Sequence, residues 1–80
     1  MTERIWYELW DVETNNAVAS FATQGEAVAF VRQIVAKQSA EYLEQLVLLE
    51  VNRFGHTKDL ARGRDELDRF QARGGTIGAQ

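Results

Sequence analysis

The residues with the clearest capacity for chemistry are the single histidine of the chain, His56, and an aspartate three positions later, Asp59. An imidazole oriented by a neighbouring carboxylate is a common arrangement for general acid–base catalysis. The chain has no cysteine, however, and Ser20 and Ser39 stand in segments without the pattern of a nucleophile elbow. We therefore predict that His56 is a turn residue, that the chain has no catalytic residue and that it is not an enzyme.

Metal and cofactor sites are equally hard to build from this composition. One histidine and no cysteine disfavour a transition-metal site, and the carboxylates lack the spacing of a calcium loop. The glycine-rich residues 74–78 resemble a phosphate loop, but such a loop must lead into a helix whose N-terminus faces the phosphate. No such helix is predicted after these residues, so we reject this interpretation. Gly63, between two arginines, is better explained as the start of a helix. We expect no metal, no cofactor and no small-molecule substrate.

Charge is distributed unevenly along the chain. Residues 1–52 hold three basic and eight acidic residues, a net charge of −5, whereas residues 53–80 hold six basic and four acidic residues, a net charge of +2. Four basic side chains are therefore candidates for contacting a nucleic acid or another anion: Arg53, Lys58, Arg62 and Arg64. Because acidic residues interleave with them, the plainer interpretation is a solvated surface of paired charges.

Alternating apolar and β-branched residues predict strands over residues 4–12, 17–22 and 45–53, and a short fourth strand over residues 56–61. A tight turn at Asn15 and Asn16 joins the first two strands, because asparagine tolerates the left-handed backbone that such a turn requires. A second turn is expected at Gly55. The polar segment 39–44 is predicted as a connection in which Tyr42 and Leu43 pack against the body of the domain.

Two helices are predicted. Thr23 and Glu26 form a capping-box pattern, in which the Thr23 hydroxyl accepts from the Glu26 backbone and the Glu26 carboxylate accepts from the Thr23 backbone. An apolar stripe then runs to about residue 38. A second, short helix is expected over residues 65–73, ended by the glycine pair at 74 and 75. This helix carries only two large apolar residues, Leu67 and Phe70.

These elements predict one α+β domain over residues 1–73 and a flexible tail over residues 74–80. The sheet would have three or four strands, mixed or antiparallel, in the order ββαββα or ββαβα, with the main helix packed on one face. The helical crossover between the second and third strands would allow those two strands to lie parallel.

The first strand is apolar on both faces. Side chains alternate across a strand, so Ile5, Tyr7 and Leu9 share one face, while Trp6 and Trp10 share the other. Residues 46–51 have the same two-sided character. One helix can shield only one face of a small sheet, so the tryptophan face needs another cover.

Two interpretations explain how the tryptophan face is removed from water. The second helix could bury it through Leu67 and Phe70, or the face could be a protein interface, where tryptophan is favoured. The second helix is small for this task, so we predict an interface with these contact residues: Trp6, Glu8, Trp10, Leu46 and Leu48. Base stacking on the same aromatic residues is disfavoured, because the acidic residues beside them repel phosphate.

Residues 7–11, the Asn15–Asn16 turn and residues 27–32 together resemble a set of small bacterial ββα-type domain proteins without an assigned activity. This resemblance covers roughly residues 5–70 and implies the fold alone. A fainter similarity links Gln24-Gly25-Glu26-Ala27 to the helix start of HicB-type antitoxins. The third strand and proline-containing loop expected before that helix are missing, and no recognisable DNA-binding module follows.

The sequence thus predicts a non-enzymatic protein-interaction module that acts as a homodimer or as a small partner or regulatory subunit. The alternative is a small nucleic-acid-binding or antitoxin-like regulator that uses the basic C-terminal third. No apolar run approaches the roughly 20 residues that cross a bilayer, so we expect no membrane partner and a cytoplasmic location.

Overall fold

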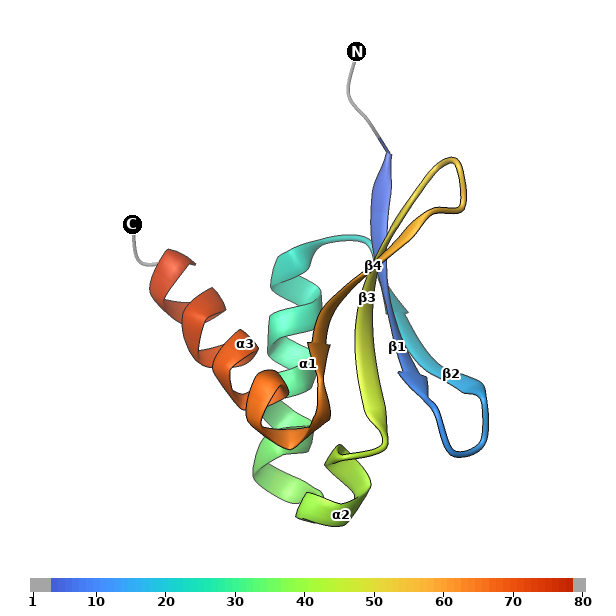
Figure 1. Cartoon of the computed structure of the whole chain (residues 1–80). Helices are drawn as coiled ribbons and strands as arrows, with labels where there is room; N and C mark the ends of the chain where they lie inside the picture. Colours follow the sequence, from blue (N-terminus) through green and yellow to red (C-terminus); the bar gives the residue numbers. More distant parts are fainter. Residues whose placement is uncertain (1–3, 79–80) are drawn as a thin grey trace.

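The computed structural model describes residues 4–78 of the chain, and the side chains of residues 4–73. Within this range the element order is β1 (Ile5–Asp11), β2 (Asn16–Phe21), α1 (Gln24–Lys37), α2 (Ala40–Leu43), β3 (Leu46–Asn52), β4 (Thr57–Arg62) and α3 (Gly63–Gly78). The α+β class is confirmed, and so is the fourth strand. Figure 1 shows the helices on one side of a twisted sheet.

The strands lie in the order β2-β1-β3-β4, and every neighbouring pair is antiparallel. Because β2 and β3 both run antiparallel to β1, they point in the same direction, as a helical crossover allows. They are not hydrogen-bonded neighbours, however, since β1 lies between them. The two most apolar strands, β1 and β3, therefore occupy the centre of the sheet.

The hairpin between β1 and β2 turns where the asparagine pair predicted it. Asn15 has a φ of 59°, in the left-handed region. One carboxylate oxygen of the buried Asp11 accepts hydrogen bonds from the backbone nitrogens of Glu13 (2.9 Å) and Thr14 (3.3 Å). These bonds satisfy donors that the turn leaves unpaired, which explains why an aspartate ends the strand.

The first helix begins with the predicted cap, with one change. The Thr23 hydroxyl accepts from the Glu26 backbone nitrogen at 3.2 Å, but the Glu26 carboxylate accepts from Ala22 at 3.0 Å and not from Thr23. The carboxylate reaches one residue further back, and the chain is fixed as it leaves β2. The helix buries Ala27, Val28 and Val31.

The segment predicted as a polar connection contains one short helix, α2. Ser39 caps it, because its hydroxyl accepts from the Tyr42 backbone nitrogen at 3.1 Å. Leu43 is buried and Tyr42 half-buried, so both pack against the domain as expected.

The last helix, α3, begins at Gly63, the glycine predicted as a helix start, two residues before the range predicted for the helix itself. Its other end differs from the prediction, because α3 continues through Gly74 and Gly75 to Gly78 and the glycine pair does not end it. Whether the chain after residue 73 is flexible stays a prediction, and residues 79 and 80 lie outside the described range.

The core lies between the sheet and the helices. Its fully buried members come from both central strands, from β4 and from all three helices: Leu9, Ala27, Val31, Leu43, Leu46, Leu48, Ala61 and Leu67. Since Leu67 belongs to this cluster, α3 packs on the same side of the sheet as α1 (Figure 1). The second helix therefore does not cover the tryptophan face, and that competing prediction is wrong.

Candidate functional site: the open face of the sheet

The pairing of β1 with β3 decides which side chains share a face. Trp6 lies opposite Val51, Glu8 opposite Leu49 and Trp10 opposite Val47. Directly paired residues point to the same side of a sheet. This side is the one away from the helices, and we call it the open face: Trp6, Glu8 and Trp10 of β1, Val47, Leu49 and Val51 of β3, and Asp59 and Arg62 of β4.

Two residues of the predicted interface lie elsewhere. Leu46 pairs with Asp11 and Leu48 with Leu9, and both leucines are buried in the core, 1% and 0% exposed. Their assignment to the tryptophan face is wrong. The pairing matches even positions of β1 with odd positions of β3, so the residues beside the tryptophans are Val47, Leu49 and Val51. A shift of one residue in register exchanges the two faces of a strand.

Glu8 connects the two tryptophans. Its Oε2 accepts a hydrogen bond from Trp6 Nε1, and its Oε1 accepts one from Trp10 Nε1, both at 2.9 Å. All three side chains are half-buried. An indole N–H that leaves water normally needs an acceptor, and here one carboxylate serves both rings. We call Trp6, Glu8 and Trp10 the tryptophan clamp.

The open face contains buried apolar side chains although no described helix covers it. Val47 and Val51, the direct partners of Trp10 and Trp6, are only 3% and 5% exposed. Leu49, opposite Glu8, is half-buried. The residues opposite the indoles are thus the ones most shielded from water, which indicates that the tryptophans form the roof of a small second apolar layer. The clamp fixes the rings in that position.

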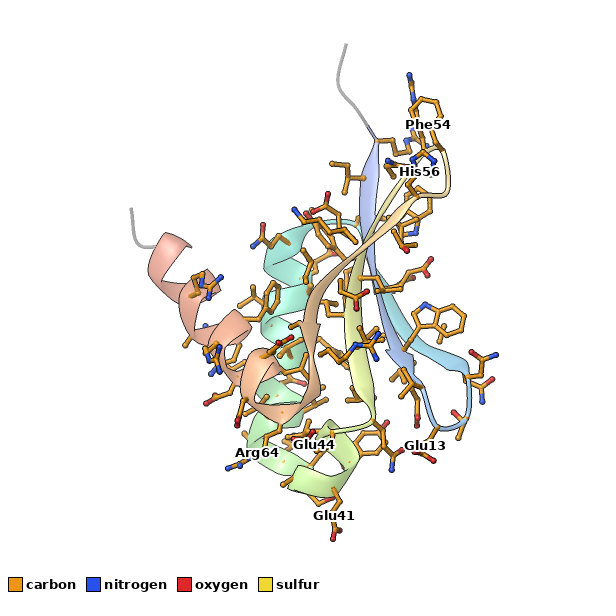
Figure 2. The ribbon with its side chains drawn as sticks, in the orientation of Figure 1. Glu13, Glu41, Glu44, Phe54, His56 and Arg64 are labelled. Atoms are coloured by element: carbon orange, nitrogen blue, oxygen red, sulfur yellow. The ribbon has the colours of Figure 1, made fainter. Side chains whose placement is uncertain are left out.

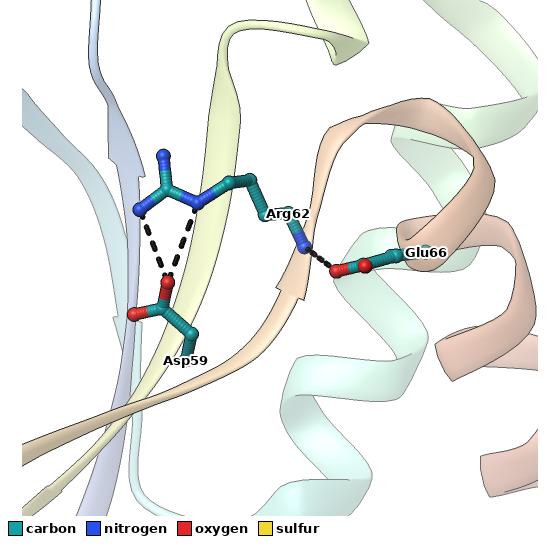
Figure 3. A network of polar contacts seen from close by, with 3 residues as sticks. All are labelled: Asp59, Arg62 and Glu66. Carbon is teal, nitrogen blue, oxygen red and sulfur yellow. Dashed lines mark hydrogen bonds and ion pairs between the residues drawn. The ribbon is translucent and has the colours of Figure 1, made fainter.

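An arginine at the end of β4 completes the face. The Arg62 guanidinium donates to Asp59 Oδ2 at 3.0 and 3.3 Å, while its backbone nitrogen donates to Glu66 at 2.7 Å (Figure 3). Arg62 lies opposite Val47 and Asp59 opposite Leu49, so this ion pair lies on the open face. The cation of Arg62 is therefore matched within the chain.

Glu8 has no cationic partner among the described side chains. The ion pairs among the described side chains are Arg62–Asp59 and Arg64–Asp65, and neither involves Glu8. Its two bonds come from neutral indole donors, which orient the carboxylate but leave its negative charge uncompensated. Asp59 and Glu8 both lie opposite Leu49, on its two sides. Of these two acids in one row, the chain neutralises only Asp59.

The four basic candidates for nucleic-acid contact are not gathered into one patch. Arg53 lies in the β3–β4 turn, with its guanidinium 4.9 Å from the centre of the Phe54 ring, and Lys58 follows at the start of β4. Arg62 is the last residue of that strand, and Arg64 lies just beyond it in α3. Figure 2 shows this separation, with Phe54 at one end of the molecule and Arg64 at the other.

His56 lies in the exposed turn before β4, where its backbone nitrogen donates to Asn52 Oδ1 at 3.1 Å. Its ring centre is 6.3 Å from that of Phe54, while the Asp59 carboxylate is held by Arg62. The two residues with the clearest capacity for acid–base chemistry are therefore not joined. Gly55, with a φ of 83°, makes the predicted turn there.

A shallow hollow of about 330 Å³ lies between β4 and α3. Acidic and basic side chains line it in equal number around an apolar floor: Asp59, Leu60, Glu66, Arg69, Phe70 and Arg73. Both acidic side chains of the hollow, Asp59 and Glu66, already accept hydrogen bonds from Arg62, so neither is left without a partner in the chain. In the described part of the chain we find no cluster of side chains able to hold a metal ion and no helix long and apolar enough to cross a membrane.

The sequence interpretation missed the valines and Leu49 of β3 and the ion pair of β4. A signal for the β3 residues was present, because alternate positions of residues 46–51 must face opposite sides. The strand pattern alone did not say which set lies beside the tryptophans.

No protein-family model matches the chain, and no curated protein or solved structure shows significant similarity to it. The open face therefore has to be interpreted from its own residues.

Proposed function

We propose that the chain is a non-enzymatic protein-interaction module that binds another polypeptide through the open face of its sheet. The observation that carries the proposal is the combination of two half-buried tryptophans with a sheet face that no described helix covers. Tryptophans in fixed positions are typical anchors of protein interfaces. Scattered exposed apolar residues are ordinary, but aromatic residues grouped around buried valines are not.

Charge favours a polypeptide over a nucleic acid as the partner. The unmatched charge of the open face is the Glu8 carboxylate, which repels phosphate, and the basic residues lie at both ends of β4. Nucleic-acid binding needs a continuous positive surface. Among the described residues, Arg53, Lys58, Arg62 and Arg64 form no such continuous surface, so we propose a polypeptide in preference to a nucleic acid.

The size of the open face suggests weak or transient binding. Four strands about 4.8 Å apart and about seven residues long give a flat area of roughly 400 Å², whereas a stable interface buries about 800 Å² on each partner. A partner that also contacts the β1–β2 hairpin would gain area, because Val12 and Val18 there are 48% and 41% exposed.

A second copy of the chain is the less favoured occupant. Glu8 and Leu49 lie at the centre of the open face, so a two-fold axis through that centre would bring two Glu8 carboxylates together. Like charges in a partly buried interface oppose association. We therefore propose a different polypeptide as the partner and expect the purified chain to sediment as a monomer.

The decisive experiment places a photo-cross-linking residue, benzoylphenylalanine, at Leu49 in the centre of the open face. The matched control carries it at Gln33, on the exposed side of α1. Irradiation in the producing cells should give a polypeptide adduct from position 49 and none from position 33. The adduct partner, once purified, should bind the unmodified chain in solution. Equal adducts from both positions, or none from position 49, would contradict the proposal.

Sedimentation equilibrium from about micromolar to millimolar concentration tests the identity of the occupant. A tight dimer that Trp10→Glu abolishes and Phe54→Glu preserves would identify a second copy on the open face and overturn the choice of a different partner. Phe54 is a suitable control because it is an aromatic residue, 63% exposed, outside the open face. Far-UV circular dichroism of each variant confirms that the monomer remains folded.

A further inference from the structure

We propose that the tryptophan clamp is a receptor for an arginine side chain of the partner, with Glu8 as the counter-charge and the two indoles as stacking surfaces beside it. This inference rests on the proposed function and names the chemistry that the open face recognises. It follows from three properties of the described residues: a half-buried carboxylate without a cation, two aromatic rings fixed beside it, and a neighbouring acid that the chain has already neutralised.

The first property is the state of Glu8. Each of its oxygens receives one hydrogen bond, at 2.9 Å, from an indole nitrogen. A carboxylate has about four acceptor positions, so about two remain for a further donor. Removing a charged group from water without an opposite charge is costly. A partner that covers the open face would remove water from Glu8, and it has to bring a cation to offset that cost.

The second property is the pair of indoles. Tryptophan attracts cations to its ring face more strongly than tyrosine or phenylalanine does. Both indole N–H groups point at the same carboxylate, so the rings flank the negative charge from two sides along β1. The hydrogen bonds hold both rings before any partner arrives, which lowers the entropic cost of binding. A guanidinium fits this arrangement better than an ammonium, because it is planar, stacks on aromatic rings and donates in a fork to a carboxylate.

The third property is the comparison with Asp59. Glu8 and Asp59 lie on either side of Leu49 in one row across the sheet. The chain supplies Asp59 with an arginine, since the Arg62 guanidinium binds it at 3.0 Å. Both hydrogen bonds of that guanidinium go to Asp59, so Arg62 is the partner of Asp59 and not of Glu8. The open face thus already contains one carboxylate–guanidinium pair, Asp59 with Arg62. Two strands away it contains a second carboxylate, Glu8, which is positioned to bind another guanidinium.

The test uses the two indole N–H signals, which a chain with two tryptophans provides in a ¹⁵N-edited proton spectrum. Acetyl-arginine amide is titrated into the wild-type chain, and acetyl-citrulline amide is the control, because citrulline has nearly the same shape without the positive charge. We expect both indole signals to shift with arginine in a saturable way. The citrulline compound should bind about tenfold more weakly, a difference typical of losing a charge-assisted contact. Equal shifts with both compounds, or none with arginine, would overturn the inference without any variant.

A substitution of Glu8 tests whether its carboxylate is the negative charge that binds the arginine compound. Glu8→Gln keeps one acceptor oxygen and removes the charge, so the preference for arginine over citrulline should disappear. Glu13→Gln, in the exposed β1–β2 turn (Figure 2), removes the same charge away from the clamp and should keep the preference. An unchanged preference in Glu8→Gln would show that the cation binds elsewhere and would refute the receptor.

The cross-linking experiment keeps this inference separate from the proposed function. If the adduct from position 49 forms equally well in the Glu8→Gln chain, the open face binds a polypeptide but not through an arginine. If no adduct forms at all, the proposed function fails whatever the small compounds do. Loss of the adduct in Glu8→Gln together with its retention in Glu13→Gln supports both.

Discussion

The two faces of this four-stranded sheet bury apolar side chains in different ways. On the covered face, leucines, valines and alanines from strands and helices fill the core, and its fully buried members are aliphatic. On the open face, the nearly buried valines of β3 are paired with the two tryptophans of β1, and one of them also with the arginine of an ion pair. The covered face is stabilised by close packing of aliphatic groups, which is insensitive to charge. The open face depends on a carboxylate that holds two rings, and this dependence makes it suited to recognition.

The largest expected effect compares adjacent leucines that point to opposite faces. Leu48 is fully buried among core residues, whereas Leu49 is half-buried on the open face. Leu48→Ala should reduce the free energy of unfolding by about 2–5 kcal/mol, because a cavity remains in the core. Leu49→Ala should cost about 1 kcal/mol, since only part of the side chain leaves water on folding. Urea denaturation measures both, and equal losses would contradict the assignment of the faces.

The next effect concerns Gly63, which joins β4 to α3 on the covered face. Gly63 has a φ of 82°, and a Cβ there would lie 3.1 Å from Glu44 Oε1. Gly63→Ala should therefore cost about 1–2 kcal/mol through backbone strain. Gly25→Ala is the matched control, because Gly25 lies in α1, where an added Cβ would make only an ordinary contact of 3.9 Å with Thr23 Oγ1. This variant should be more stable than the wild type by about 0.4–1 kcal/mol. Thermal unfolding gives the sign of each change, and two changes of the same sign would argue against this geometry.

A smaller effect is expected from the clamp itself. Trp10→Phe keeps most of the apolar area over Val47 but removes the N–H that Glu8 accepts. One lost hydrogen bond at a half-exposed site should cost about 1 kcal/mol. The Trp6 indole signal should shift as well, because the same carboxylate holds both rings. A Trp6 signal that does not move would mean that the two rings are independent in solution.

The smallest effect is a pH dependence on the covered face. Burial, and then the charge of Glu50 on the paired strand, raises the pKa of Tyr7 above its ordinary value of 10.0. The unfolded chain then loses the Tyr7 proton at lower pH than the folded chain. The contribution of Tyr7 to the free energy of unfolding is therefore fully present below about pH 10. It is lost as the pH rises through the pKa of Tyr7 in the folded chain.

Spectrophotometric titration of the phenolate and urea midpoints above pH 9 check this dependence. Tyr7→Phe should remove the part of the decline that belongs to this group. A decline of the same size in Tyr7→Phe would assign the alkaline sensitivity to other residues.

Local features were predictable wherever a few neighbouring residues decide the conformation. The Asn15 turn, the Thr23 cap, the Gly55 turn and the start of a helix at Gly63 depend on backbone angles and short hydrogen bonds. The glycine pair was misleading, because α3 continues through Gly74 and Gly75. A glycine weakens a helix by only about 1 kcal/mol, so it need not end one.

The candidate site was predictable in part. The alternation of β1 placed Trp6, Glu8 and Trp10 together, and the tryptophans indicated a face that needs a cover. Leu46 and Leu48 were assigned to that face because both faces of β3 are apolar, so hydrophobicity did not distinguish them. The bond of Glu8 to both indoles has no signature in the sequence beyond its place between them.

The sequence by itself determined the first three strands, the main helix with its Thr23 cap, the turns at Asn15 and Gly55, and the side of β1 on which the tryptophans lie, because these depend on residues close together in the chain. Only the tertiary structure decided that β1 separates β2 from β3, that even positions of β1 meet odd positions of β3, and that α3 joins α1 on one side. These choices depend on contacts between distant segments, where many pairings bury similar apolar area. The packing of the whole chain selects one of them, and that selection leaves the tryptophan clamp on the open face.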